Sequence, residues 1–161
     1  MTSTKESISK GQMPPDLASI DAAKRILKEQ RVKWVLCAFT DIRGIFQSFS
    51  TPVKHFTEGD QYFDAGIGFD GSSIRGFKEL HTSDMIFYPD PDALYVLPWT
   101  EGPQRTAVII GDIREPYGSL DAADCDARGY VCKRALEKAE SMGFTPYFGP
   151  EIEFFVFKSI D

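Results

Sequence analysis

Residues 32–50, VKWVLCAFTDIRGIFQSFS, contain the pattern that decides the fold. The first half is β-branched and aromatic, and from Trp34 onward it is apolar on both faces, which predicts a well-covered strand. The DIRG sequence at 41–44 is a turn signal, because Asp stands at its first position and Gly at its fourth. IFQSFS follows as a return strand that Pro52 ends. The stretch therefore predicts a β-hairpin from Trp34 to Ser50.

A helix precedes this hairpin, and further strands follow it. Asp16 is a candidate N-cap for a helix that runs to about Gln30. Its apolar stripe comprises Leu17, Ile20, Ala23 and Leu27. Three short strands are predicted at 85–88, 93–97 and 105–113. Together these elements predict an α+β layer of about five strands with one helix across it.

The connection from Glu58 to Asp84 shows no lasting periodicity, and a connection this long inside a compact domain is usually functional or disordered. At its centre lies GFDGSSIRGF, residues 68–77, which places an acidic residue between glycines and before two serines. One interpretation is a flexible surface loop with an ordinary turn at Asp70 and Gly71. The other is a mobile loop that carries Asp70 to a reaction centre.

The sequence changes character at residues 115–118, Glu-Pro-Tyr-Gly, where we place a domain boundary. Beyond it, a second helix is predicted from apolar residues at spacings of three and four, with Gly143 as its C′ residue. Its candidate N-caps are Asp124 and Asp126, and its apolar positions are Val131, Ala135, Ala139 and Met142. Residues 146–157 are predicted to form the last strand.

Two glutamates interrupt the apolar segment GPEIEFFVF at 149–157. In a strand, side chains at i and i+2 point to the same side, so Glu151 and Glu153 would project together, roughly 7 Å apart at their roots. Burial of two bare carboxylates is costly unless one is protonated or a cation neutralises them. Hard oxygen ligands suit Mg²⁺ or Mn²⁺. The alternative is that this face of the strand is simply exposed to water.

Length and composition exclude several classes of protein. A chain of 161 residues, 42% of them hydrophobic, fits one ordinary domain or a small domain plus part of another. A net charge of −6 argues against nucleic acid as the main partner. No apolar run approaches the roughly 20 residues of a transmembrane helix, so no membrane partner is expected. The polar start, residues 1–15, lacks the apolar centre of a signal peptide and is predicted to be a flexible tail.

The cysteines and histidines do not predict a metal centre. Three cysteines without a C-x-x-C pair favour a reduced, cytoplasmic setting. Cys125 and Cys132 are seven residues apart, near one face of the second helix, and we interpret them as small core residues rather than ligands. His55 and His81 are too isolated to indicate a zinc site.

Several spaced motifs, taken in order, resemble the first third of type I glutamine synthetase. They are GFDGSSIRGF, Ser83-Asp84-Met85, the run Pro89-Asp90-Pro91 and YFGPEIEFFVF; FTDIRGIFQSF also resembles that family's N-terminal hairpin. The resemblance extends from about Asp16 to Phe157. It implies a β-grasp domain at 16–117, followed at 118–161 by the first helix and strand of an α/β catalytic domain that is incomplete here.

The resemblance also implies a chemistry. Members of the family are ligases that make glutamine from glutamate and ammonia, with ATP as co-substrate and γ-glutamyl phosphate as intermediate. Glu151 and Glu153 occupy the positions that bind two divalent ions, Mg²⁺ or Mn²⁺, one each. Asp70 occupies the catalytic position that binds ammonium in the neighbouring subunit's site and helps to remove its proton. Gly71, Ser72 and Ser73 complete that substrate loop, and the implied assembly is a ring-shaped, dodecamer-like homo-oligomer.

The sequence departs from the family's pattern in residues and in length. Gly76-Phe77 stands where bacterial members often have Gly-Trp, and Ala127 where the second helix often starts with proline. The family's other metal ligands, nucleotide pocket and glutamate-binding arginine lie beyond the last strand. We therefore expect this chain, a truncated or split portion, to have no ligase activity alone.

Two alternatives to glutamine synthesis remain open. The chain could be a non-catalytic β-grasp module for assembly or regulation, or part of a related γ-glutamyl-amide ligase that acts on another amine. Asp70 and its intact loop favour ammonia over bulky amines. Whichever holds, apolar surface around Phe154 to Phe157 is expected to be exposed in the isolated chain and to promote self-association.

Overall fold

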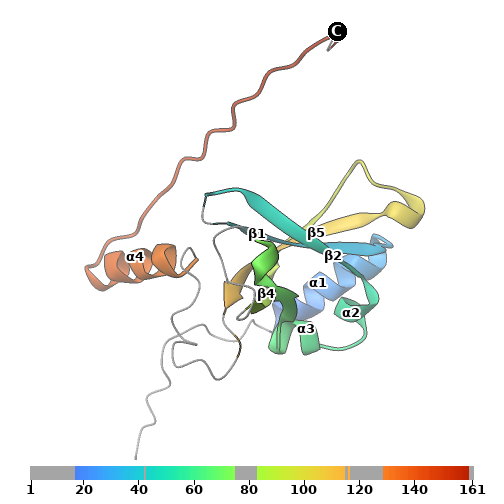
Figure 1. The fold of residues 1–161 in the computed structure, drawn as a ribbon, viewed down its shortest axis with the longest axis horizontal. Coiled ribbons are helices and arrows are strands. Elements are labelled where there is room, and N and C mark those ends of the chain that lie inside the picture. Colours follow the sequence, from blue (N-terminus) through green and yellow to red (C-terminus); the bar gives the residue numbers. More distant parts are fainter. Residues whose placement is uncertain (1–16, 42, 75–82, 115, 117–128, 160–161) are drawn as a thin grey trace, which may run out of the picture.

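The computed structural model describes residues 17–41, 43–74, 83–114, 116 and 129–159. Its main body is a five-stranded sheet with one long helix against it (Figure 1). The strands, in the order in which they lie in the sheet, are β2 (Phe46–Pro52), β1 (Trp34–Thr40), β5 (Thr106–Arg114), β4 (Asp84–Val96) and β3 (Ile67–Asp70). The predicted α+β layer of about five strands and one helix is therefore confirmed.

The central pair of strands, β1 and β5, is parallel, with Trp34 opposite Thr106. The other neighbours, β1 with β2, β4 with β5 and β3 with β4, are antiparallel. A parallel pair requires a long connection between its strands, and here that connection contains β2, β3 and β4. The sheet centre is thus closed by strands from the two ends of the domain.

Helix α1 (Leu17–Glu29) buries one side chain in each turn against the sheet. Ile20, Ala23 and Leu27 are each about 1% exposed, as predicted, but Leu17 is 70% exposed. Leu17 is the first residue of the helix, where the stripe has not yet reached the core. The proposed N-cap, Asp16, lies outside the described residues. An ion pair between Lys24 and Asp60 joins the helix to the segment before α3 (Gln61–Asp64).

The C-terminal end of α1 turns directly into β1. Arg31 has a positive φ of 53°, and its N–H donates to the carbonyl of Lys28 over 3.1 Å. The N–H of Val32 donates to the carbonyl of Leu27 over 3.0 Å, and both of these side chains are buried. This is a Schellman motif with its usual apolar contact, but with Arg where Gly is common.

The predicted hairpin is confirmed, with Thr40 opposite Phe46 and Trp34 opposite Pro52. Gly44 has a φ of 80°, and its N–H donates to the carbonyl of Asp41, which closes the DIRG turn. The prediction that β1 is covered on both faces is wrong for Trp34, whose side chain is 43% exposed. It begins the strand on the face opposite the core cluster, because Val35, Cys37 and Phe39 point to the core.

Two predicted strands, 85–88 and 93–97, are one strand, β4. The Pro-Asp-Pro run between them is accommodated by a register shift between Pro89 and Leu94 along β5. Such an irregularity tolerates proline in a strand, because the ladder is locally interrupted. The predicted strand at 105–113 corresponds to β5.

The segment from Glu58 to Asp84 is less irregular than predicted. It contains α3, the strand β3 and the short 3-10 helix η1 (Gly71–Ser73), while residues 75–82 lie outside the described part. We missed β3 because it is only four residues long and contains Gly68. Two further short helices are α2 (Lys54–Thr57) and η3 (Gly102–Gln104).

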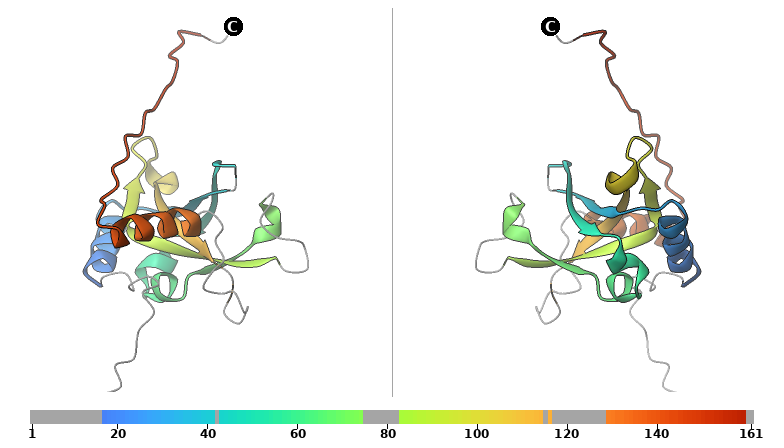
Figure 2. Two further views of the ribbon diagram at one scale, coloured as in Figure 1. Left: turned by 90° about the vertical axis from the view of Figure 1, so that its left-hand side faces the viewer. Right: turned by 90° about the vertical axis from the view of Figure 1, so that its right-hand side faces the viewer.

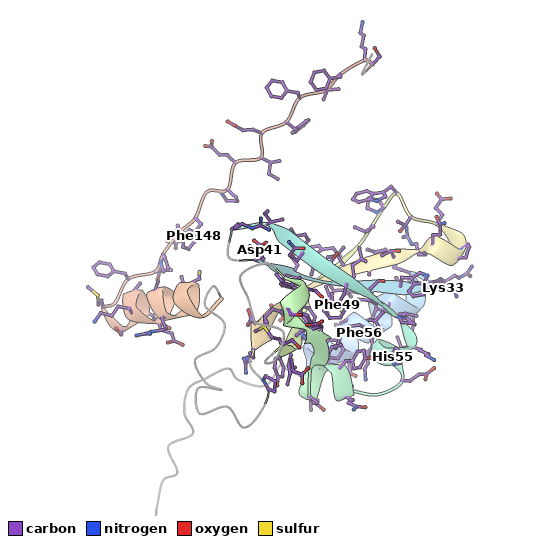
Figure 3. The ribbon with its side chains drawn as sticks, viewed as in Figure 1. Lys33, Asp41, Phe49, His55, Phe56 and Phe148 are labelled. Atoms are coloured by element: carbon purple, nitrogen blue, oxygen red, sulfur yellow. The ribbon has the colours of Figure 1, made fainter. Side chains whose placement is uncertain are left out.

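The core lies between the sheet and the helices α1, α2 and α3. Phe56 and Phe87 are its largest fully buried side chains. In Figure 3, Phe49 and Phe56 lie within the body of the fold, and Phe49 packs against the buried cluster. Phe49 also forms an edge contact with Phe87, with ring centroids 5.7 Å apart. Aromatic packing thus links the hairpin to β4.

The second helix, α4 (Gly129–Ser141), ends as predicted at a C′ glycine. Gly143 has a φ of 81°, and the N–H of Phe144 donates to the carbonyl of Ala139 over 3.0 Å. The candidate N-caps Asp124 and Asp126 lie outside the described residues, as does Cys125. Cys132 is exposed, so its interpretation as a core residue is wrong in this structure. Met142, one of the predicted apolar positions of this helix, is also exposed, at 58%.

The strand predicted at 146–157 is not found. Residues 144–157 contain neither helix nor strand and run as an extended trace (Figure 2). A strand exists only when its backbone is paired, and none of the described strands pairs with this segment. Its side chains are exposed as a consequence; Phe148, labelled in Figure 3, is 77% exposed.

Candidate functional site

The loop after β3 is fixed to the start of β4 by a glycine. Asp70, the last residue of β3, lies opposite Asp84, the first residue of β4. The N–H of the next residue, Gly71, donates to the carbonyl of Ser83 over 2.7 Å. Gly71 is buried, and a Cβ there would lie 2.7 Å from Met85 Cγ and 2.9 Å from the Ser83 carbonyl oxygen. Only glycine allows this close approach.

Asp70 itself is exposed and is held by the residue two positions later. The N–H of Ser72 donates to Asp70 Oδ1 over 2.9 Å, and its hydroxyl donates to the same oxygen over 2.6 Å. The Ser72 hydroxyl and then its N–H lower the pKa of Asp70 and outweigh the opposing effect of slight burial, and the Ser83 and Ser73 side chains add smaller lowering contributions. The carboxylate is therefore an anion at neutral pH.

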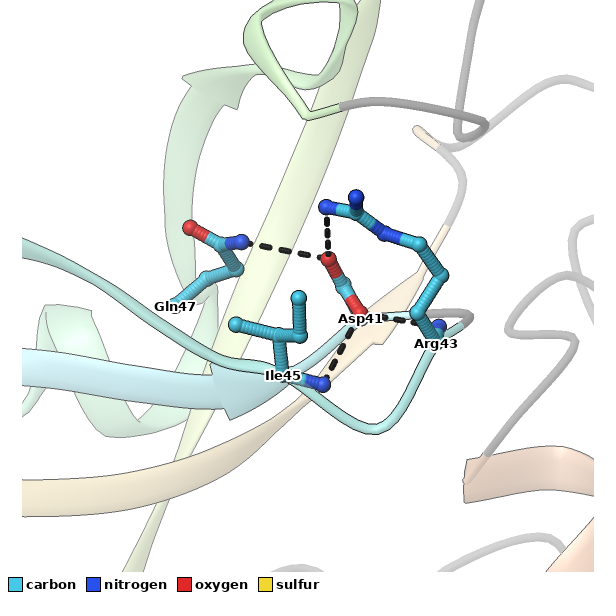
Figure 4. Close-up of polar contacts among 4 residues, drawn as sticks. All are labelled: Asp41, Arg43, Ile45 and Gln47. Atoms are coloured by element: carbon cyan, nitrogen blue, oxygen red, sulfur yellow. Dashed lines mark hydrogen bonds and ion pairs between the residues drawn. The ribbon is translucent and has the colours of Figure 1, made fainter.

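A second carboxylate, Asp41, is fully buried at the hairpin turn (Figure 4). Its Oδ1 accepts from the N–H groups of Arg43 and Ile45, over 2.8 and 3.0 Å. Its Oδ2 accepts from the Arg43 guanidinium and the Gln47 amide, each over 3.1 Å. Burial alone would raise the pKa of Asp41, but these four donors outweigh it and hold that pKa well below its ordinary value. Because every donor is local, this carboxylate stabilises the turn.

The two glutamates of the C-terminal segment, Glu151 and Glu153, are both exposed. Their neighbours on the other side, Ile152 and Phe154, are 88% and 76% exposed, so neither side of the segment is covered. In the described part of the chain, no group of three or more His, Cys, Asp or Glu side chains could hold a metal ion. The carboxylate oxygens of Glu151 and Glu153 suit Mg²⁺ or Mn²⁺, but a pair of carboxylates is an incomplete ligand set.

Three contributors to these sites were missed from the sequence. Ser83 and Met85 hold the loop of Asp70, and Gln47 binds Asp41 from across the hairpin turn. Ser83 and Met85 belong to a motif quoted above for the family resemblance, but no role followed from it. For Gln47 the signal was the hairpin register, because it lies opposite Phe39, two residues before Asp41. The contact of Gly71 with Met85 depends on β3, which we did not predict.

Cys37 lies in the core, and burial raises the pKa of its thiol to about 12. It is therefore a packing residue rather than a nucleophile. As for membranes, none of the helices in the described ranges has the length and apolar character that a bilayer crossing requires.

Comparison with known proteins identifies two families of domain along the chain. Residues 31–116 match the family described as the β-grasp domain of glutamine synthetase. Residues 124–161 match the family described as the catalytic domain of glutamine synthetase.

Curated relatives that are named glutamine synthetase match most of the chain. A glutamine synthetase of Archaeoglobus fulgidus is 47% identical over 146 residues, which are 90% of this chain and 29% of the relative. One of Thermotoga maritima is 41% identical over 138 residues, 86% of this chain and 30% of the relative. The chain thus spans about three tenths of the length of these relatives.

Solved structures show the same fold at lower sequence identity. A Plasmodium falciparum glutamine synthetase solved by electron cryomicroscopy superimposes with a TM-score of 0.60 at 23% identity, over 78% of this chain and 23% of that one. A ligand-free structure of GmaS gives a TM-score of 0.58 at 22% identity, over 74% of this chain and 26% of that one. On the family matches and the curated relatives together, the chain belongs to the glutamine synthetase family.

Proposed function

We propose that this chain is the N-terminal part of an ATP-dependent ligase that joins ammonia to the γ-carboxyl group of glutamate and forms glutamine. The observation that carries the proposal is the ordered Asp70 loop. It presents an exposed carboxylate that its own neighbours keep ionised. Such a group suits a small cationic substrate, and the relatives that share this region are named glutamine synthetases.

Asp70 attracts ammonium and accepts one of its protons. The ammonia so formed attacks the γ-carbonyl carbon of γ-glutamyl phosphate. A carbon–nitrogen bond forms, the carbon–oxygen bond to the phosphate breaks, and inorganic phosphate leaves with that bond's electron pair. The amide nitrogen loses a further proton to solvent or to a second base. Gly71, Ser72 and Ser73 form the loop that presents Asp70, which acts in the site of a neighbouring subunit.

Glu151 and Glu153 each supply one carboxylate ligand to a divalent ion, Mg²⁺ or Mn²⁺. The exposure of both side chains leaves them free to join further ligands from the rest of the protein. Bound ions of this kind neutralise ATP phosphates and stabilise the charge that moves in phosphoryl transfer. The role of Glu151 and Glu153 is to hold these ions.

The proposed organisation follows from the same assignment. Residues 16–117 form the β-grasp domain and residues 118–161 begin the catalytic domain, while the tail predicted at 1–15 lies outside the described residues. The complete protein is a cytoplasmic, ring-shaped homo-oligomer. A site shared between subunits explains why Asp70 lies at the rim of the sheet, on the edge strand β3, rather than in a pocket of its own domain.

The decisive test compares Asp70→Asn with wild type in the full-length protein. We expect glutamine formation to fall by roughly 10²–10⁴-fold and the KM for ammonium to rise, because a neutral amide neither attracts the cation nor accepts its proton. The KM values for glutamate and ATP should stay near those of wild type. Asp64→Asn, which changes an exposed aspartate of α3, is the matched control. Undiminished turnover of the Asp70 variant would refute the proposal.

Two further measurements test the metal assignment and the amine. Glu151→Gln and Glu153→Gln should each raise the Mn²⁺ concentration needed for half-maximal activity, and full activity of the double variant at unchanged Mn²⁺ would contradict the assignment. Turnover with methylamine in place of ammonium tests the alternative substrate. Preference for methylamine would indicate a ligase for another amine. The isolated 161-residue chain should show no turnover above background.

A further inference from the structure

We propose that Ser72 is a positioning residue that orients the carboxylate of Asp70 for ammonium. This inference rests on the proposed function, because it assigns Ser72 a task only if Asp70 meets the cation. Ser72 does not itself touch the reacting atoms. Its effect passes through the aspartate that it holds.

Ser72 is placed by the backbone around it rather than by chance exposure. Gly71 precedes Ser72 in the chain, and its close contacts with Met85 and Ser83 fix its position. Ser72 is itself half-buried, in the middle of η1. Its N–H and hydroxyl therefore start from a fixed point at the end of β3.

Both hydrogen bonds of Ser72 end on one oxygen, Asp70 Oδ1. The hydroxyl contact of 2.6 Å lies in the short range that is typical of O–H donors to an ionised carboxylate. Two donors on one oxygen restrict rotation of the carboxylate about its side-chain bonds. An exposed aspartate without them would sample several rotamers, and only some of these would present it to the substrate.

Ser72 also favours the ionised form of Asp70. The facing strand β4 places the ionisable residue Asp84 directly opposite Asp70. Hydrogen-bond donors favour the anion of a carboxylate. Ser72 supplies the largest of the contributions that lower the pKa of Asp70, ahead of the Ser83 and Ser73 side chains.

The test uses the full-length protein with Ser72→Ala, Ser72→Thr and Asp70→Asn. We expect Ser72→Ala to raise the KM for ammonium about tenfold or more, because a hydrogen bond to a charged group is lost. The value of kcat at saturating ammonium should change less. The acid limb of kcat/KM for ammonium should move to higher pH, because the pKa of Asp70 returns toward its ordinary value. Ser72→Thr, which keeps the hydroxyl, should restore both.

The controls separate this inference from a structural role and from the proposed function. Ser50→Ala, an exposed serine on β2, should leave all kinetic constants unchanged. If Asp70→Asn raises the KM for ammonium but Ser72→Ala changes neither that KM nor the pH profile, the inference is overturned and the proposed function stands. A Ser72→Ala variant that only unfolds at lower temperature, with no selective change for ammonium, also overturns it. If Asp70→Asn leaves ammonium use unchanged, the proposed function itself fails.

Discussion

At the scale of single residues, two polar side chains show how local hydrogen bonding decides the role of an aspartate. Asp41 accepts from donors two to six positions away and Asp70 accepts from Ser72, two positions away, yet Asp41 is fully buried and Asp70 is exposed. The buried one has every acceptor position used by its own hairpin. The exposed one is held through Oδ1 by Ser72 and stays open to solvent, which is what a substrate ligand requires.

Asp41→Asn should destabilise the domain and flatten the acid limb of its stability profile. An amide offers one acceptor oxygen and would direct its NH₂ group at two of the four present donors. The folded-state pKa of Asp41 is depressed, so its contribution is present above the unfolded pKa of about 3.9 and is lost as pH falls through the lower folded value. Thermal unfolding between pH 7 and strong acid measures this.

The matched control for that experiment is Asp64→Asn, which should keep both the midpoint and the acid limb of wild type. If Asp41→Asn unfolds at the same temperature as wild type at neutral pH, the network of Figure 4 does not stabilise the turn.

Arg31→Gly should stabilise the domain by about 0.5–1 kcal/mol. Arg31 is exposed and has a φ of 53°, a conformation that costs an L-residue with a Cβ more than it costs glycine. Urea unfolding measures the difference. Arg31→Ala is the control, since it removes the charged side chain but retains the strain; equal stabilisation by both variants would show that φ is not the cause.

At the scale of elements, β5 depends on a glycine that lets β4 approach it. A Cβ at Gly111 would lie 2.6 Å from the ring of Phe87 and would also overlap the carbonyl oxygen of Tyr88. Phe87 is fully buried and contacts the rings of Phe39 and Phe49, so it has little freedom to move. The glycine therefore matters for packing between strands.

Gly111→Ala should destabilise the domain by at least about 1–3 kcal/mol, because strand β4 or the Phe87 ring must shift. Gly68→Ala in β3 is a matched control, since a Cβ there meets nothing within 4 Å. Chemical denaturation of both variants makes the comparison. Equal stability of the two would mean that the sheet yields at Gly111 without cost.

The elements that could be predicted from sequence are those with local patterns. Helix α1, the hairpin and β5 each follow from periodicity or turn residues within one stretch. Strand β3 could not be predicted, because four residues with a glycine become a strand only by pairing with β4. The Asp70 loop was found from its motif, but the hold of Ser72 on it depends on hydrogen-bond geometry that spacing does not contain. The metal role of Glu151 and Glu153 remains a prediction.

At the scale of the whole molecule, a packed sheet domain and an uncovered apolar segment belong to one chain. The segment 144–157 exposes eight large hydrophobic side chains, among them Tyr147 at 91% and Phe155 at 87%. Exposed apolar patches of this kind promote association.

The isolated chain should therefore self-associate and bind a hydrophobic dye. Sedimentation equilibrium should give a mass above the 18.1 kDa of the monomer. A variant with serine at Phe154, Phe155 and Phe157 should move toward the monomer mass and lose most dye fluorescence. The double variant Glu151→Gln, Glu153→Gln, which changes charge but not apolar area, should still associate. A monomeric wild type without dye binding would contradict the prediction.

The parallel pairing of β1 with β5 has a consequence for the order of events during synthesis. Strand β1 cannot pair with β5 until Thr106, the partner of Trp34, has left the ribosome. The middle of the sheet therefore forms only after that point. Until then the β1 edge of the hairpin is unpaired and its apolar face is only partly covered. Pairing between strands so far apart in the sequence is also intrinsically slow. The nascent domain is most exposed to misassembly during that interval, and chaperone contact would be expected to concentrate there.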